Sequence, residues 1–329
     1  MNNLKKVGLS ALAGSLVAFS ANAGEVSVSG SAGMYLEHIN GGAANSGKSF
    51  SMDNQLTFTG GGELDNGLNV SVSFVIDQGD DTTTSVGSGT LAFGGGAPFD
   101  SHSVTVSSDS LGSLTMHGEG GSSASGMVDG TVSGNIWDAF QAAADEPEAA
   151  PAGSNGLVYV LPSIMDGVAI TASYAPKGTS YDSSSAWSVA YTGIDGLSLT
   201  YASGEDNATA GSKADHEVMK ATYAYGPITV GYMESDYNDI VAAGDQNTTA
   251  YNVAYTISDE LSISYGSEEL EFGVQSATNV AAEFERLSVT YVTGGMTLTA
   301  SQASGDNVSY STATTEDREV WALGASFAF

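Results

Sequence analysis

Carboxylates are the residues of this chain best suited to chemistry, and six of them gather in one unusual stretch. In residues 118–154 the alternation of apolar and polar residues that marks most of the chain stops, and small residues take over. The stretch contains Glu119, Asp129, Asp138, Asp145, Glu146 and Glu148. Carboxylate oxygens attract cations, and they can also hold a hard ion such as calcium. Cation attraction is therefore the first chemistry that the sequence indicates.

Two acidic clusters, at residues 77–81 and 145–148, could supply oxygen ligands to calcium. Neither cluster matches the twelve-residue loop of the common calcium-binding motif. We therefore expect loose attraction of cations rather than a specific metal site. No cofactor is predicted, and a loosely bound calcium ion remains an open alternative.

Nucleotide binding and enzymatic catalysis are two further chemistries that the sequence does not favour. Residues 42–49 match the phosphate-binding pattern G-x-x-x-x-G-K-[ST], which works only between a buried strand and a helix. Polar residues 37–40 precede the match and strand-like residues 50–58 follow it, so it is interpreted as an exposed loop. The four histidines are not accompanied by a serine in a G-x-S-x-G turn, and cysteine is absent. No enzyme is expected.

The first 23 residues have the layout of a secretory signal peptide. Lys5 and Lys6 form the positive end, residues 7–19 the apolar core, and Ala21-Asn22-Ala23 the cleavage site. The apolar run is too short for a membrane-spanning helix. We expect cleavage before Gly24 and export from the cytoplasm.

The exported part of the chain is strongly acidic. Once Lys5 and Lys6 are removed, six basic residues remain against 38 acidic ones. Such a chain cannot neutralise a phosphate backbone, which argues against nucleic acid binding. The absence of cysteine also excludes disulfides. Stability must then come from backbone pairing, which a closed barrel supplies without an open sheet edge.

Most of the exported chain consists of about sixteen segments in which apolar and polar residues alternate. In residues 68–76, Leu68, Val70 and Phe74 share one face, and polar residues between them share the other. Short turns alternate with longer acidic loops, at residues 205–213, 237–246, 271–281 and 305–316. Tyrosines end many apolar rows, as in the aromatic girdle of a membrane barrel. We predict an all-β, transmembrane antiparallel β-barrel of about sixteen strands.

The chain ends in alternating aromatics, with Gly324, Phe327 and Phe329 in the last strand-like segment. Together with the export signal, the sixteen segments and the long insertion after the fifth, this ending resembles the general porins of Gram-negative outer membranes. Ala322 departs from the family pattern, in which a polar residue is usual. The resemblance implies a porin barrel over residues 24–329, set in outer-membrane lipid, and passive diffusion of small hydrophilic solutes and ions.

The resemblance also implies how the barrel is built and assembled. Residues 118–154 occupy the place of the family's third loop, which folds into the lumen and narrows the pore. Porins of this kind are usually homotrimers. Their terminal phenylalanine, here Phe329, looks like the signal read by the barrel-assembly machinery.

The pore constriction is predicted from the insertion together with strand phase. Porins of this family usually carry arginines on the wall opposite the third loop. In this chain few basic residues are expected to face the lumen, because few alternate along a strand with apolar residues that would face lipid. They are Lys220, Arg286 and Arg318. They form either a thin positive wall or pairs with neighbouring loop carboxylates. His117 and Glu119 share a phase opposite to that of nearby apolar residues, so both are expected in the lumen.

The predicted constriction therefore consists of Glu119, Asp129, Asp138, His117, Lys220, Arg286 and Arg318. Because acids outnumber bases there, a preference for cations is expected. The alternative is a secreted or surface-anchored acidic β-protein, such as a calcium-binding adhesin or layer protein. That class shares the composition, but it needs neither the tyrosine rows nor a terminal phenylalanine.

Overall fold

The computed structural model of the chain describes residues 26–41, 47–77, 100–140, 150–176, 182–207, 213–313 and 316–329. The predicted signal peptide at residues 1–23 and the expected first exported residue, Gly24, lie outside the described residues. The acidic cluster at 145–148 and most of the cluster at 77–81 also lie outside them.

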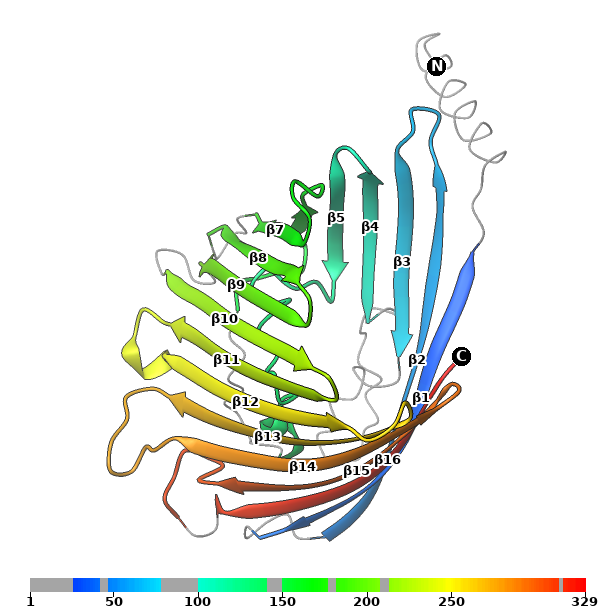
Figure 1. Cartoon of the computed structure of the whole chain (residues 1–329). Helices are drawn as coiled ribbons and strands as arrows, with labels where there is room; N and C mark the ends of the chain where they lie inside the picture. The colour runs from blue at the N-terminus through cyan, green and yellow to red at the C-terminus, as the bar shows by residue number, and fades with distance from the viewer. Residues whose placement is uncertain are drawn as a thin grey trace, which may run out of the picture.

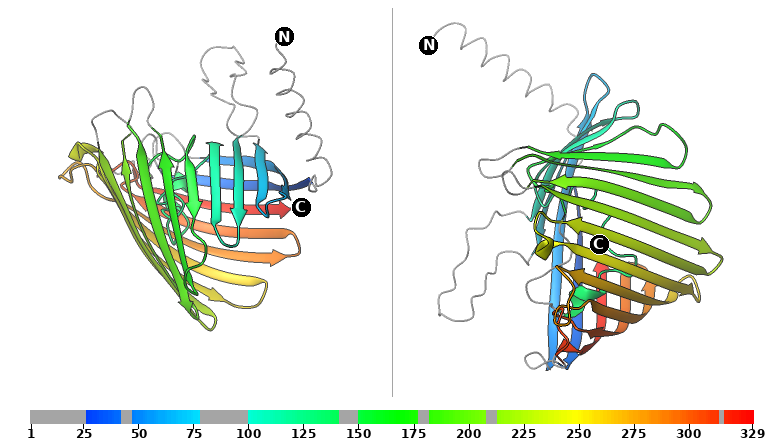
Figure 2. Two further views of the ribbon diagram at one scale, coloured as in Figure 1. Left: turned by 90° about the horizontal axis from the view of Figure 1, so that it is seen from above. Right: turned by 90° about the vertical axis from the view of Figure 1, so that its left-hand side faces the viewer.

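The described residues form sixteen strands in one closed antiparallel barrel (Figure 1). Each strand pairs with its neighbours in the chain, and β1 closes the barrel by pairing with β16. Figure 2 shows the curved wall from two further sides. The strands are β1 (Ser27–Asn40), β2 (Gly47–Glu63), β3 (Asn69–Asp77), β4 (Ser101–Ser108), β5 (Gly112–Glu119), β6 (Leu157–Val160), β7 (Val168–Ala175), β8 (Ser184–Ile194), β9 (Leu197–Asp206), β10 (Ala214–Tyr225), β11 (Ile228–Asn238), β12 (Gln246–Thr256), β13 (Leu261–Phe272), β14 (Ala282–Thr293), β15 (Met296–Asp306) and β16 (Arg318–Ala328). The predicted fold class and strand number are confirmed.

Each strand has one apolar and one polar face, because successive side chains point to opposite sides. In β10, Met219 and Tyr223 are 48% and 42% exposed, and Lys220 lies on the opposite side of the strand. We call the side with the exposed apolar rows the apolar face and the other side the polar face. Continuous apolar rows of this kind suit contact with lipid rather than water. Within the described ranges, no helix has the length and apolar character needed to cross a membrane.

Short turns and long connections alternate around the barrel, as the sequence predicts. Only residues 109–111 join β4 to β5, and Gly294-Gly295 joins β14 to β15. Gly294 has a φ of 57°, a left-handed conformation that glycine adopts without strain. Because neighbouring strands are antiparallel, the short turns gather at one end of the barrel, the short-turn end, and the long connections at the other, the loop end.

The terminal residue takes part in closing the barrel. The backbone N of Gly30 donates to the Phe329 carbonyl at 2.7 Å, and the Phe329 N donates to the Gly30 carbonyl at 3.0 Å. A Cβ atom on Gly30 would lie 2.7 Å from the Phe329 ring. The missing side chain of Gly30 therefore makes room for the terminal aromatic ring at the seam between β1 and β16.

Candidate functional site

The connection between β5 and β6 packs against the polar face of the barrel. We call its described residues, 120–140 and 150–156, the inserted segment. It hydrogen-bonds to side chains of β7, β10, β13, β14 and β16. In Figure 1 the teal segment after β5 passes behind strands β9 to β13. It contains the short 3-10 helix η2 (Ile136–Phe140).

Glu268 of β13 is the main polar anchor of the inserted segment, and its side chain is only 1% exposed. Its Oε1 accepts hydrogen bonds from the Ile136 backbone N at 2.9 Å, from the Ser133 hydroxyl at 2.8 Å and from the Thr131 hydroxyl. Its Oε2 accepts one from the Trp137 backbone N at 3.1 Å. The carboxylate thus satisfies donors at the start of η2 that a helix end leaves without partners.

The three basic residues predicted in the constriction all donate to backbone carbonyls of this segment. Lys220 Nζ donates to the Gly130 carbonyl. Arg286 Nη2 donates to the carbonyls of Ser133 at 2.6 Å and Gly134 at 3.1 Å. These contacts hold the turn before η2 against β10 and β14.

Arg318 binds the other end of η2. Its Nη1 donates to the Phe140 carbonyl at 3.1 Å, and its Nη2 forms an ion pair with Glu316 Oε2 at 3.0 Å. Each of the three basic residues has an acidic neighbour: Lys220 has Asp129, Arg286 has Glu268, and Arg318 has Glu316. Asp129 and Glu316 are loop carboxylates, as in the alternative of pairing with neighbouring loops, whereas the neighbour of Arg286 is Glu268 of strand β13.

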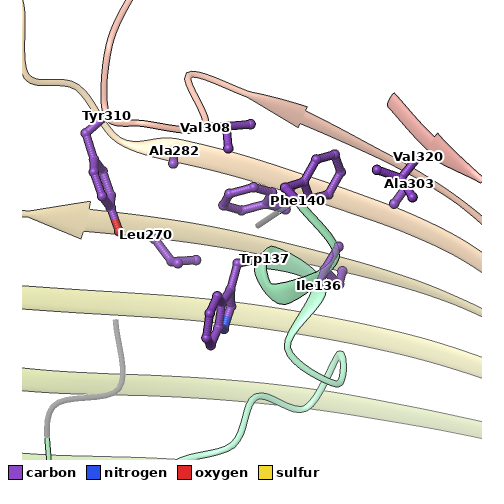
Figure 3. Close-up of a cluster of buried hydrophobic side chains, with 10 residues drawn as sticks. Ile136, Trp137, Phe140, Leu270, Ala282, Ala303, Val308, Tyr310 and Val320 are labelled. Atoms are coloured by element: carbon purple, nitrogen blue, oxygen red, sulfur yellow. The ribbon is translucent and has the colours of Figure 1, made fainter. Parts of the chain in front are cut away.

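Apolar packing reinforces these polar contacts. Ile136, Trp137 and Phe140 of η2 bury their side chains among apolar residues of the polar face and of the connection between β15 and β16 (Figure 3). Their partners are Leu270, Ala282, Phe284, Ala303, Val308, Tyr310 and Val320. A second cluster packs Val128 and Val132 against Ala202, Val218, Met233 and Ala250. Burying one such large side chain contributes about 1.5–3 kcal/mol, so several of them fix the segment firmly.

Two further hydrogen-bonded contacts lie nearer the start of the segment. The His216 side chain of β10 is 1% exposed, with Nδ1 3.0 Å from the Ser125 hydroxyl and Nε2 3.3 Å from the Ser235 hydroxyl. The Ala124 backbone N donates to the Ser173 hydroxyl of β7 at 2.8 Å. The segment is therefore held along its described length, from β7 to β16.

The two acids predicted in the middle of the insertion differ in their surroundings. Asp129 is half-buried and lines a pocket of about 440 Å³ together with Ser122, Ser123 and Ser154. Asp138 lies on η2 and is exposed. Both belong to the inserted segment; Asp129 lies near the positive charge of Lys220, whereas Asp138 is exposed on the surface of the segment.

The predicted phase of Glu119 is wrong, because the strand pairing shifts at Gly118. Ser103 pairs with His117, but His102 pairs with Glu119, which leaves Gly118 as an extra residue. Directly opposed residues of an antiparallel pair share a face. Glu119 therefore lies with His102 on the apolar face, and only His117 has the polar-face orientation predicted for both.

Sequence reasoning missed Glu268 and His216, the two buried polar anchors. The sequence did contain a signal for them, namely apolar residues at strand positions that face the polar side. Leu270 and Phe284 are apolar, yet they occupy the polar face of β13 and β14. An apolar residue in that phase indicates that something covers this part of the wall.

The described part of the chain holds no group of three or more His, Asp or Glu side chains placed to bind a metal ion. The clusters at 77–81 and 145–148, where calcium was considered, lie mostly or wholly outside that part.

A closed barrel of sixteen antiparallel strands with exposed apolar rows defines the class of transmembrane β-barrels. A family model described as Gram-negative porin matches residues 8–285. The chain belongs to the Gram-negative porin family, which confirms the resemblance seen in the sequence. It is an outer-membrane protein, and its family points to a diffusion channel rather than an enzyme.

Solved structures share the fold at low sequence identity. An anion-selective porin from Comamonas acidovorans is 17% identical with a TM-score of 0.66, and the match covers 93% of this chain and 99% of that one. A multiply substituted mutant of the porin from Rh. blastica is 17% identical with a TM-score of 0.63, covering 93% and 100%. A structure titled "Asymmetric conductivity of engineered proteins" has a TM-score of 0.64 at 17% identity, covering 93% and 100%. No match was found among curated proteins.

Family membership and fold do not favour the alternative of a secreted acidic β-protein. At 17% identity the solved structures establish the fold alone. The ion preference of this chain depends on its own pore-facing residues.

Proposed function

We propose that this porin prefers cations, and that the inserted segment lies in the lumen and narrows the passage. The observation that carries the proposal is that Lys220, Arg286 and Arg318 all donate to carbonyls of the segment. With the polar face inside the barrel, these contacts draw the segment across the lumen. They also engage the three basic side chains, which would otherwise attract anions.

Charge compensation supports the same conclusion. Each of the three basic residues has one acidic neighbour, so the three pairs add little net field to the pore. Carboxylates without a basic neighbour then set the sign of the field, and Asp138 is exposed on η2. Carboxylates around a constriction favour cations over anions. Small neutral hydrophilic solutes also pass, at rates set by the size of the opening.

Liposome swelling with solutes of similar size and different charge tests the proposal. We expect a cationic solute to enter faster than a neutral one, and an anionic solute to enter most slowly. Asp138→Asn should reduce this difference because Asp138 is exposed on η2, and Asp129→Asn should reduce it as well because it leaves the charge of Lys220 uncompensated. Glu269→Gln, an exposed acid on the apolar face of β13, serves as the control. Equal entry of cationic and anionic solutes through the unaltered protein would refute the cation preference.

We also propose a homotrimer, in which the apolar face of β15, β16 and β1–β5 meets a second copy of the chain. Among the described residues, tyrosines on the apolar face run from Tyr159 in β6 to Tyr291 in β14, and that face of β15, β16 and β1–β5 has none. Tyrosine girdles mark contact with the lipid interface. Phe50 is 87% exposed on the tyrosine-free side. Sedimentation of the detergent-solubilised protein at the mass of one chain would contradict the trimer.

Two smaller proposals follow from the family. Phe329 serves as the signal for the barrel-assembly machinery, so its deletion should lower the amount of barrel in the outer membrane. Diffusion needs no cofactor, and any calcium held by the acidic loops is bound loosely.

A further inference from the structure

We propose that Asp53, oriented by Tyr35, is a second determinant of cation preference, placed on the barrel wall away from the inserted segment. The ligands are small monovalent cations such as alkali or ammonium ions in transit. This inference rests on the proposed cation preference and assigns part of it to a wall residue outside the insertion.

Tyr35 and Asp53 meet on the polar face of neighbouring strands. The Tyr35 hydroxyl donates a hydrogen bond to Asp53 Oδ2 at 2.9 Å. Tyr35 stands directly opposite Ser51, so Asp53 is its diagonal neighbour across the β1–β2 pair. The Asp53 side chain is exposed, which leaves the carboxylate accessible to ions in the lumen.

Two glycines leave the room for this contact. Gly33 stands opposite Asp53, and a Cβ atom there would collide with both the Tyr35 hydroxyl and the Asp53 carboxylate. Gly324 of β16 stands opposite Tyr35, and a Cβ atom there would lie 2.9 Å from the Tyr35 ring. The ring therefore lies across β16 and β1, and its hydroxyl fixes the direction of the carboxylate.

The pair lies at about the depth of the anchored segment. Counted from the short-turn end, Tyr35 is eight residues from the start of β1 at Ser27, and Glu268 is seven from the start of β13 at Leu261. Strands of one barrel share a common tilt and rise about 3.3 Å per residue. An ion passing the turn held by Glu268 therefore also passes the wall near Tyr35 and Asp53.

No basic side chain on these strands offsets the charge of Asp53. Among the described residues of β1–β5, Lys48 is the sole lysine or arginine, and it stands opposite His38. The His38 ring lies 5.6 Å from that of Trp321 on the apolar face, so Lys48 is directed away from the lumen. Asp53 thus differs from Glu268, which shares its charge with a basic neighbour.

The test is the reversal potential of the purified full-length protein in a planar bilayer under a potassium chloride gradient. Asp53→Asn should lower the potassium-to-chloride permeability ratio by about threefold, because one unit charge acting through roughly 7 Å of water at about 0.1 M salt changes the permeability of each ion by about 1.6-fold, in opposite directions. The matched control is Glu217→Gln. Glu217 accepts a hydrogen bond from the Tyr201 hydroxyl at 3.3 Å on the apolar face, so its loss should leave the ratio unchanged.

Tyr35→Phe tests the positioning role through a double-mutant cycle. It should change the permeability ratio in the unaltered protein and have no further effect in Asp53→Asn. Equal effects in both backgrounds would overturn the role of Tyr35. An unchanged ratio in Asp53→Asn, with a reduced ratio in Asp138→Asn, would overturn the role of Asp53 and leave the proposed function standing. Absence of cation preference in the unaltered protein would instead overturn the proposed function.

Discussion

Replacing Glu268 by alanine should release part of the inserted segment while leaving the barrel intact. The substitution removes the acceptor of four hydrogen bonds, from Thr131, Ser133, Ile136 and Trp137. The barrel ladder does not depend on this side chain, because β13 pairs with β12 and β14 through its backbone. The effect should therefore be local.

The size of the effect follows from the donors left behind. Ile136 and Trp137 are buried, and each backbone N–H left without an acceptor costs about 1–3 kcal/mol. The two together give about 2–6 kcal/mol, before the loss of the two hydroxyl contacts is counted. The apolar contacts of η2 oppose release, so we expect a segment that detaches part of the time. Glu268→Gln keeps one acceptor oxygen and should lie between alanine and the unaltered protein.

Single-channel recordings and liposome swelling measure this release. Glu268→Ala should show added higher-conductance states and admit larger neutral sugars, because the segment no longer narrows the passage continuously. Glu269→Ala is the matched control, since Glu269 is the next residue and is exposed on the other face of β13. The reasoning is refuted if Glu268→Ala folds and keeps both the conductance and the size limit of the unaltered protein.

Three further predictions use other parts of the structure. Glu119→Gln should leave the permeability ratio unchanged, because Glu119 lies opposite His102 on the apolar face; a clear fall in a bilayer recording would contradict that placement. Gly30→Val should lower the temperature at which the heat-modifiable gel band shifts, since a Cβ atom at Gly30 meets the Phe329 ring and overpacking costs about 1–3 kcal/mol. Treatment with a chelator should leave conductance unchanged, because the described residues offer no three-ligand metal group; loss of conductance would point to a bound ion.

The strands could be predicted from the sequence because their signal is local. Alternation in a segment such as β10 depends only on lipid on one side and polar surroundings on the other. The short turns carry their own signal in glycine pairs such as Gly294-Gly295. For these reasons the number of strands, their pairing order and the two ends of the barrel could all be predicted from the sequence.

Contacts with the inserted segment and a local shift in strand pairing could not be predicted from the sequence, as Glu268 and Glu119 show. Glu268 and Glu269 look alike in the sequence, yet one is buried under the inserted segment and the other is exposed. Glu119 changes face because of one extra residue at Gly118, and nothing in the local pattern marks that shift. The alternation of residues along β10 placed Lys220 on the polar face. Its hydrogen bond to the Gly130 carbonyl, ninety residues away in the sequence, could not be predicted from that alternation.

The reversal potential of the unaltered protein in a planar bilayer under a potassium chloride gradient is the most direct test of the central claim. The basic residues are bound to the inserted segment, and carboxylates without a basic neighbour remain in the pore. We therefore expect potassium to permeate faster than chloride, and the reversal potential to have the corresponding sign. A potential of the opposite sign, or one at zero, would mean that Lys220, Arg286 and Arg318 still govern the field in the pore, and would contradict the account.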